Sequence, residues 1–168
     1  KVTGDTITLG AAISLTGKYR TNGAHTLNGY NLAVKVINAA GGVRVGGKTY
    51  RLAIDHHDDK STEALSIHLV GRMIKRDGIK FMLGPYGSRL TKAVATVTEK
   101  YKIPMVEAEG PSRAIFGQGY KYLFAVLSTS EQYLASAIAL AAEIAEKNGK
   151  KPGDVKVAMV FEDDPFSL

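Results

Sequence analysis

Short apolar runs alternate along this chain with longer segments in which apolar residues recur every three or four positions. We expect strands in the runs 6–13, 50–55, 79–83, 103–106, 122–126 and 156–161. We expect helices in the segments 24–40, 61–76, 89–100 and 131–148. Strands that alternate with helices over short connections form a parallel sheet with helices on both faces. The pattern therefore predicts an α/β fold.

The stretch 78–91 is the most informative part of the pattern. The run 79–83 is almost entirely apolar, which is typical of a strand buried on both faces. Gly84 ends it, Gly87 permits a tight turn, and Ser88 is expected to cap the following helix. The free N–H groups and the dipole at a helix N-terminus favour an anion. The stretch is therefore a candidate binding site for a small carboxylate.

Glycine and small polar residues mark the ends of other elements. Gly46 and Gly47 predict a tight hairpin turn before the strand 50–55. Ser61 is expected to cap the second helix, whose first turn contains Glu63. One side of the last predicted helix is apolar and consists of Leu134, Ile138, Ala141 and Ile144.

Polar loops follow three of the predicted strands, at 14–23, 84–89 and 107–113. The carboxyl ends of parallel strands meet at one edge of a sheet, and ligands of such folds bind in the crevice at that edge. We therefore expect the three loops, including the polar segment 18–22, to border one binding site.

The composition excludes several classes of protein. The chain has 168 residues, no cysteine and a formal net charge of +6. Without cysteine it forms neither a disulfide framework nor a thiolate metal site, and no apolar run approaches the roughly 18 residues that span a bilayer. The basic residues are scattered and lack interleaved aromatics, so we expect no nucleic-acid partner. Residues 1–5 contain neither an initiator methionine nor an apolar signal segment, which suits a processed protein or a trimmed piece equally.

The most metal-like cluster is His56-His57-Asp58-Asp59. Imidazole and carboxylate groups are common metal ligands. However, neighbouring residues in extended backbone point to opposite faces, which makes adjacent histidines poor chelators. We interpret the cluster as a strand end that leads into the next helix, and we expect neither a metal nor another cofactor.

Motifs of two enzyme classes are incomplete. A nucleophile elbow around Ser88 requires glycine where Leu90 stands, and no histidine motif supplies a base. The phosphate-loop spacing is matched by Gly42 and Gly47-Lys48-Thr49, but these residues lie in a predicted hairpin instead of opening a helix. A serine-dependent α/β hydrolase stays open as an alternative, whereas nucleotide binding is not expected.

Charged and aromatic residues in the loops indicate how a ligand would be held. Arginines beside the loops could pair with an anion. Glu107 and Glu109 could instead recognise a cationic group. Tyr19 and Tyr86 could supply apolar and hydroxyl contacts. The two arginines are Arg89 and Arg113.

Five separated signatures occur in the order expected of one protein family: the segments 7–17, 37–43, 58–59, 84–88 and 103–104. Together they resemble the type I periplasmic binding proteins that serve branched-chain amino acid ABC importers. The resemblance implies two α/β lobes, joined by three crossing strands, that close on a small ligand. It assigns 1–126 to the N-terminal ligand-binding lobe and 127–168 to a hinge crossing and the start of the second lobe. A full member would continue beyond Leu168.

The resemblance also implies roles for single residues. Ser88 matches the serine that holds the ligand carboxylate through its hydroxyl and backbone N–H. Glu109 and Pro111 stand where the family has a small residue and a threonine, and proline has no N–H to donate. Phe166 takes the place of a second-lobe tyrosine that packs over the ligand, and these departures favour an aromatic or otherwise modified carboxylate. The residues expected to bind ligand are Tyr19, Asn22, Tyr86, Gly87, Ser88, Glu109, Gly110, Pro111 and Phe166.

The function that the resemblance implies is that of an extracytoplasmic substrate-binding protein, not an enzyme. It would capture a small carboxylate-bearing solute, an amino acid or an aromatic acid, and deliver it to the membrane subunits of an ABC importer. Such proteins are periplasmic or extracellular, and the signal peptide that exports them is cleaved. The alternative is the ligand-sensing domain of a receptor or regulator with the same fold.

Overall fold

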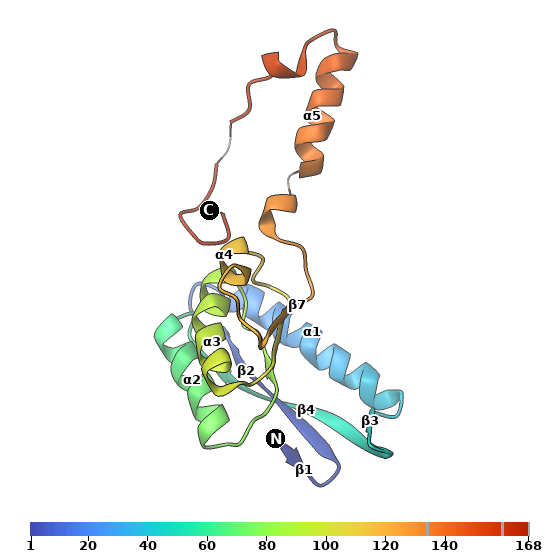
Figure 1. Cartoon of the computed structure of the whole chain (residues 1–168), viewed down its shortest axis with the longest axis vertical. Coiled ribbons are helices and arrows are strands. Elements are labelled where there is room, and N and C mark those ends of the chain that lie inside the picture. The colour runs from blue at the N-terminus through green and yellow to red at the C-terminus, as the bar shows by residue number, and fades with distance from the viewer. Residues whose placement is uncertain (134, 159, 168) are drawn as a thin grey trace.

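The computed structural model describes residues 1–133, 135–158 and 160–167 (Figure 1). The strands are β1 Val2–Thr3, β2 Thr6–Ile13, β3 Val43–Val45, β4 Lys48–Asp58, β5 Met82–Leu83, β6 Met105–Glu107 and β7 Leu123–Ala125. The helices are α1 Arg20–Ala39, α2 Glu63–Lys75, α3 Ser88–Tyr101, α4 Arg113–Phe116 and α5 Ala135–Lys147. Two 3₁₀ turns, η1 Ser130–Gln132 and η2 Pro152–Asp154, flank α5.

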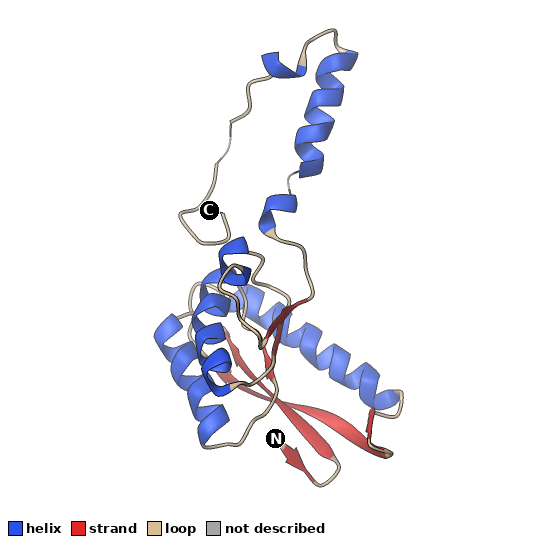
Figure 2. Ribbon diagram, viewed as in Figure 1, coloured by secondary structure: helices blue, strands red, loops and turns tan. Residues whose placement is uncertain are grey.

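Strand β2 is the centre of the sheet. The strands lie in the order β3-β4-β2-β5-β6-β7, with β1 also paired to β2. The five strands from β4 to β7 in this order run parallel, whereas β1 and β3 each pair antiparallel with a neighbour. Helix α1 packs on β2 and β4, and α2 and α3 lie together on the other face (Figure 2). The predicted α/β fold with a mainly parallel sheet is confirmed.

The direction in which strands are added to the sheet reverses at β2. The chain passes from β2 to β4 on one side and then crosses to β5 on the other side. A crevice opens at the carboxyl ends of the strands where such a reversal occurs. The loops that follow β2 and β5 therefore border the same crevice.

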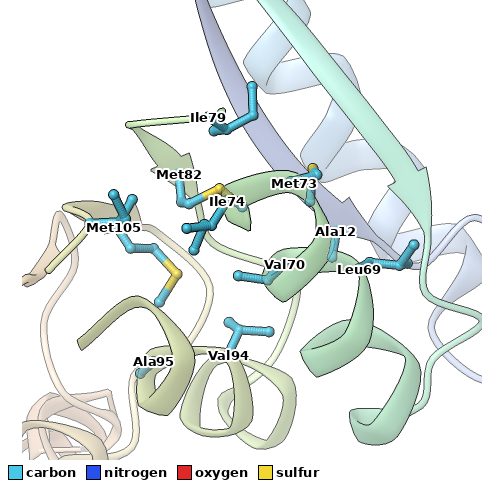
Figure 3. Close-up of a cluster of buried hydrophobic side chains, with 11 residues drawn as sticks. Ala12, Leu69, Val70, Met73, Ile74, Ile79, Met82, Val94, Ala95 and Met105 are labelled. Atoms are coloured by element: carbon cyan, nitrogen blue, oxygen red, sulfur yellow. The ribbon is translucent and has the colours of Figure 1, made fainter. Parts of the chain in front are cut away.

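The main hydrophobic core lies between the sheet and helices α2 and α3 (Figure 3). Gly10 allows β2 to pass close beneath this core, because a Cβ atom there would lie 2.8 Å from Met82 Sδ. Burial of the apolar side chains provides the main drive to fold this lobe. The core residues are Ala12, Leu69, Val70, Met73, Ile74, Ile79, Met82, Val94, Ala95, Ile103 and Met105.

The opposite face of β5, β6 and β7 is open in the described part of the chain. Phe81, Val106 and Phe124 expose 41%, 41% and 52% of their surface. Helix α1 packs on β2 and β4, which leaves these side chains uncovered. The prediction that the run 79–83 is buried on both faces is therefore wrong, because an apolar strand has two covered faces only where an element lies over each.

Two predicted helix caps are also wrong. Helix α3 begins at Ser88 itself, and Gly87 is its N-cap residue. Helix α2 begins at Glu63, and Thr62 rather than Ser61 is its N-cap residue. Neither helix has a side-chain capping bond at this end. The two serine hydroxyls contact neighbouring loops instead.

Helix α1 begins at Arg20, which makes the predicted polar loop 18–22 shorter than expected. The first turn of α1 is polar and exposed, so apolar periodicity could not reveal it. Asn22, predicted in the loop, therefore lies in the first turn of α1.

The C-terminal part of the chain extends away from the lobe as α5 and then returns toward α4 (Figure 1). The predicted strand 156–161 is wrong for the described residues of that range, which form no strand because no neighbouring strand pairs with them there. In α5, Ile138 and Ile144 remain about half exposed, while Leu134, predicted on the same side, lies outside the described residues. None of the described helices has the length and apolarity needed to cross a lipid bilayer.

Candidate ligand-binding site

Loops from the carboxyl ends of β2, β5 and β6 meet around a cavity of about 260 Å³, and residues that follow β7 and residues of the segment 160–167 complete its lining. Four of the lining side chains are aromatic and three are carboxylates, so apolar walls and negative charge are combined. The lining residues are Tyr19, Tyr86, Gly87, Ser88, Ala108, Glu109, Pro111, Leu127, Tyr133, Glu162, Asp164 and Phe166.

Two aspartates at the end of β4 hold the loop that follows β2. Asp59 is fully buried and accepts hydrogen bonds from the hydroxyls of Ser14 (2.6 Å) and Ser66 (3.0 Å). Asp58 accepts bonds from the backbone N–H (3.2 Å) and the hydroxyl (2.7 Å) of Thr16. The acids of the sequence cluster thus join two loops, and the described residues contain no group of three metal-ligating side chains.

Tyr19 lies at the rim of the cavity because α1 starts close to β2. A Cβ atom on Gly23 would lie 2.0 Å from the carbonyl oxygen of Ser14, so only glycine permits this approach. The Tyr19 N–H donates a hydrogen bond of 3.0 Å to Ser61 Oγ. The Tyr19 ring lies beside that of Tyr86, with 5.5 Å between the ring centroids and an angle of 57° between the ring planes.

The N-terminus of α3 is directed at the cavity through Gly87 and Ser88. Gly87 has a φ of 85°, which glycine adopts without strain, and its N–H donates to the Glu109 carbonyl at 3.1 Å. Ser88 is only 1% exposed, and its Oγ accepts the N–H of Ser112 at 3.1 Å. The first N–H groups of a helix have no partner within it, so this end of α3 presents partial positive charge.

Glu107 shapes the loop that follows β6 without lining the cavity. Its Oε2 accepts the N–H groups of Glu109 (3.0 Å) and Gly110 (2.6 Å), and its side chain is fully buried. Its Oε1 is buried and has no hydrogen-bond partner in the described part of the chain. Burial raises the pKa of Glu107, although the two N–H donors oppose the shift.

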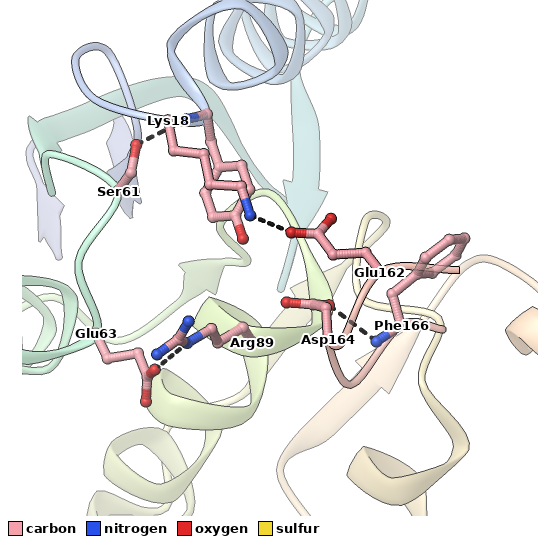
Figure 4. A network of polar contacts seen from close by, with 8 residues as sticks. Lys18, Ser61, Glu63, Arg89, Glu162, Asp164 and Phe166 are labelled. Atoms are coloured by element: carbon pink, nitrogen blue, oxygen red, sulfur yellow. Dashed lines mark hydrogen bonds and ion pairs between the residues drawn. The ribbon is translucent and has the colours of Figure 1, made fainter. Parts of the chain in front are cut away.

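The segment 160–167 forms the opposite wall of the cavity. Lys18, from the loop after β2, pairs with Glu162 (Figure 4). Asp164 Oδ1 accepts the N–H of Phe166 at 3.0 Å. The Phe166 ring meets Tyr133 edge-on, with 6.0 Å between the centroids. Residues that are far apart in the sequence therefore enclose the same cavity.

The described lining contains no lysine, arginine or histidine. The arginines predicted to bind an anion are engaged elsewhere: Arg89 pairs with Glu63 (Figure 4), and Arg113 pairs with Glu131 at 3.1 Å. Neither arginine lines the cavity, whereas the N-terminus of α3 directs partial positive charge toward it.

Burial raises the pKa values of two residues in the lining. The pKa of Glu109 is raised by burial, and the nearby Thr26 hydroxyl opposes this shift. The pKa of Tyr86 is raised by burial and by the negative charge of Glu109.

A family model described as "Periplasmic binding protein" matches residues 6–168. The chain belongs to this family. It is 28% identical over 161 residues to "Leu/Ile/Val-binding protein homolog 8" of Brucella abortus (strain 2308). The aligned residues make up 95% of this chain and 39% of that protein. The resemblance to type I members of the branched-chain amino acid group is confirmed.

Solved structures of this family share the fold. The substrate-binding protein LivJ from Streptococcus pneumoniae, in complex with isoleucine, superposes with a TM-score of 0.68 and 23% identity, over 80% of this chain and 39% of LivJ. A solute-binding protein from Rhodopseudomonas palustris BisB5, in complex with 3,4-dihydroxy benzoic acid, gives a TM-score of 0.69 and 21% identity, over 87% and 37% of the two chains. This chain spans about two fifths of the length of such proteins.

In this periplasmic binding protein chain, most of the residues predicted from the sequence to bind ligand lie around one cavity. Asn22 and Gly110 are outside its lining. Asn22 is exposed, and its carbonyl accepts the Thr26 hydroxyl at 3.0 Å. Gly110 is buried where a Cβ would lie 2.7 Å from Thr91. Those in the lining are Tyr19, Tyr86, Gly87, Ser88, Glu109, Pro111 and Phe166.

Sequence reasoning missed several lining residues. Leu127 and Tyr133 follow β7 in an irregular segment, where no periodicity indicates which side chains face inward. Glu162 and Asp164 lie in an acidic run just before Phe166, and that run was a usable signal. Ala108 also lines the cavity, and its methyl side chain has no distinctive chemistry that could indicate this.

Proposed function

We propose that residues 1–168 form the ligand-binding lobe, the hinge crossing and the start of the second lobe of an extracytoplasmic substrate-binding protein. Residues 1–126 would form the lobe and 127–168 the crossing and the start of the next lobe. The protein would capture a small carboxylate-bearing solute, an amino acid or an aromatic acid, and would have no catalytic activity.

The observation that carries this proposal is the position of the cavity. It lies at the carboxyl ends of β2, β5 and β6, at the reversal of the strand order, where α/β folds bind ligands. The N-terminus of α3 can receive a carboxylate through its free N–H groups. Ser88 would donate its hydroxyl hydrogen to the carboxylate, while its oxygen accepts the N–H of Ser112. Tyr19, Tyr86 and Phe166 supply aromatic contacts.

The relatives support the same class of solute. One is named a Leu/Ile/Val-binding protein homologue, and the two structures carry isoleucine and 3,4-dihydroxy benzoic acid. In our proposal the solute stabilises a closed arrangement by touching both sides of the cavity, and its differential affinity sets the shift toward closure. The membrane subunits of an ABC importer would then bind the closed protein in the periplasm or at the cell exterior.

Two other functions deserve comparison with this proposal. A sensor domain of a receptor would use the same cavity and differs only in the segments attached to it. A serine hydrolase would need a base beside Ser88, but the described lining contains no histidine, and Ser88 Oγ accepts a backbone N–H. Binding without turnover therefore fits the cavity better.

The proposal is tested by a thermal-shift screen of amino acids and hydroxybenzoates on the whole protein that contains these residues, followed by calorimetry of the compounds that raise its melting temperature. Tyr86→Ala should weaken the affinity of the best compound at least about tenfold, which corresponds to roughly 1.4 kcal/mol. Tyr50→Ala is the matched control, because Tyr50 lies near the amino end of β4, far from the cavity lining. Absence of any binding compound, or equal affinity of Tyr86→Ala and wild type, would overturn the proposal.

A further inference from the structure

Basic side chains from α2 and α3 gather in a groove between these two helices. The groove has a volume of about 700 Å³, and the helices that form it pack side by side (Figure 1). Its described lining contains no aspartate or glutamate. The basic residues in the lining are His68, Arg72, Lys75, Arg76 and Lys100. Positive charge is therefore concentrated on this side of the lobe.

Two of the lysines converge on one aromatic ring. The Nζ atoms of Lys75 and Lys100 lie 5.4 Å and 5.8 Å from the ring centroid of Tyr101. Neither lysine forms an ion pair within the part of the chain that the structure describes. The contact with Lys75, together with the charge of both lysines, lowers the pKa of the Tyr101 phenol. Basic residues at helix ends offset the helix dipoles, but two like charges beside one ring also repel each other.

The neighbouring acids are engaged elsewhere. Asp77 pairs with Arg76 Nε at 2.9 Å, and its other oxygen lies 3.6 Å from Arg72 Nε. That distance is too long for a hydrogen bond, and Arg72 Nε is buried without a hydrogen-bond partner among the described residues. Glu99 of α3 accepts two backbone N–H groups of the segment before β7. These acids therefore leave the charge of the two lysines unbalanced.

The groove is open because a glycine stands in its wall. Gly71 of α2 lines it, and no atom lies within 4 Å of the position that a Cβ would occupy there. A glycine inside a helix costs roughly 1 kcal/mol relative to alanine, so the space beside Gly71 is kept at a cost in stability. Ile67 and Val97 also line the groove, and Ile67 exposes 40% of its surface. The groove thus combines basic and apolar positions.

Shape and charge together favour an acidic segment of a protein over two other anionic partners. A flat lipid surface contacts the rims of a groove but does not enter it. A small phosphate compound would stay largely exposed in an open groove, whereas small-molecule sites bury most of their ligand. A peptide fills a groove along its length, with acidic side chains beside the lysines and arginines and apolar side chains beside Ile67 and Val97.

We propose that the groove between α2 and α3 is a docking site for an acidic, partly apolar peptide segment of a partner protein. The groove lies toward the C-terminal ends of both helices, whereas the solute cavity lies at the N-terminus of α3. The length of α3 separates the two sites by roughly 20 Å. The partner therefore binds outside the solute cavity, and this inference does not depend on the proposed function.

The test uses a fluorescein-labelled peptide of four Glu-Glu-Leu repeats, with a peptide of Gln-Gln-Leu repeats as its control. Fluorescence anisotropy on the whole protein that contains these residues should show binding of the acidic peptide alone, with an affinity that falls as salt is added. Lys75→Glu/Lys100→Glu should weaken this binding at least about tenfold. Lys150→Glu/Lys151→Glu makes the same charge change outside the groove lining and should bind the peptide like wild type.

Gly71→Gln tests the groove without a change of charge. The added side chain should occupy the groove and weaken peptide binding at least about tenfold. Gly29→Gln is the matched control, because Gly29 lies in α1, where a Cβ also has room, and it should have no effect on binding. Both variants should melt no lower than wild type, because glutamine is a better helix former than glycine.

Absence of peptide binding to wild type would overturn the inference. An equal loss of affinity in the two double-lysine variants, or unchanged affinity in Gly71→Gln, would do the same, because either result indicates diffuse attraction of negative charge. Tighter binding to phosphatidylglycerol vesicles or to inorganic triphosphate than to the peptide would replace the protein partner with a lipid surface or a phosphate compound. All variants should keep the solute affinity of wild type, so these failures would leave the proposed function standing.

Discussion

At the scale of single residues, the most consequential feature is a buried glutamate that never touches the cavity. Glu107 Oε2 binds two N–H groups of the loop that carries Glu109 and Pro111. Both partners lie within three positions of Glu107, so the bonds determine the shape of the loop directly. A residue expected from sequence to recognise a ligand group is instead a positioning residue for its neighbours.

Glu107→Ala should lower the free energy of unfolding by on the order of 2–4 kcal/mol, because it leaves two N–H groups without an acceptor. Glu107→Gln keeps an acceptor oxygen and should lose less. Burial raises the pKa of Glu107, so the stability of wild type relative to Glu107→Gln should fall as pH rises above the ordinary range of a glutamate, near 4.5. Urea denaturation of the three proteins at pH 5 and pH 8 measures both effects. Equal stability of Glu107→Ala and wild type would contradict this role.

The pKa of Asp58 is lowered instead of raised, so the stability that Asp58 contributes should change with pH in the opposite direction to that of Glu107. Burial alone would raise its pKa, but hydrogen bonds from the Thr16 hydroxyl and from the N–H groups of Lys60, Leu15 and Thr16 lower it. The stability that these bonds supply is present above the ordinary carboxyl pKa, near 4, and is lost as pH falls through the lower folded-state value.

Asp58→Asn should therefore be less stable than wild type at pH 7, and the difference should shrink as pH falls below about 4. Denaturation midpoints at several pH values measure this, with exposed Asp154→Asn as the control. A difference that is independent of pH would show that the charge of Asp58 plays no part.

Residue identity alone predicts which residues line the cavity better than it predicts which partner each side chain contacts. The sequence predicts that Ser88 and Ser61 cap helices, yet their hydroxyl oxygens accept the backbone N–H groups of Ser112 and Tyr19 in other loops. A small hydroxyl group has partners on every side, and only the tertiary fold determines which of them is near.

At the scale of elements, the contact between α1 and β2 decides where the first loop lies. Gly23 touches the Ser14 carbonyl, whereas Gly29 of the same helix has no atom within 4 Å of the position of a Cβ. The two glycines thus share one helix but differ in their surroundings.

Gly23→Ala should destabilise the protein by roughly 3 kcal/mol, because the backbone atoms of Ser14 cannot move aside as a flexible side chain would. Gly29→Ala should be neutral or stabilise by up to about 1 kcal/mol, since alanine is the better helix former and has room. Thermal unfolding of both variants measures the contrast. A Gly23→Ala protein as stable as Gly29→Ala would contradict the close approach of α1 to β2.

The order of elements could be predicted because apolar periodicity directly reflects strands and helices that bury one face. It was least informative where burial depends on a neighbour. The run 79–83 and the range 156–161 have similar apolar character. Among their described residues, however, only those of the first join the sheet, where Met82 pairs with Gly10 and Met105. Apolar character shows that a segment could pair as a strand, but it forms one only where the fold places a neighbouring strand beside it.

At the scale of the whole molecule, the cavity is made by segments that the sequence separates widely. Its first-lobe side was predictable, because parallel strands bring their exit loops to one edge. Its other side, from Leu127 to Phe166, depends on the path of the segments that flank α5, for which no local pattern exists. From that side, the family resemblance implies Phe166 alone.

The most direct test of the account is a crystal structure of the whole protein with the amino acid that raises its melting temperature most. We expect the solute between Tyr86 and Phe166, with its carboxylate at the N-terminus of α3. A solute bound elsewhere, for example in the groove between α2 and α3 that Arg72 and Lys100 line, with this cavity unchanged, would contradict the account.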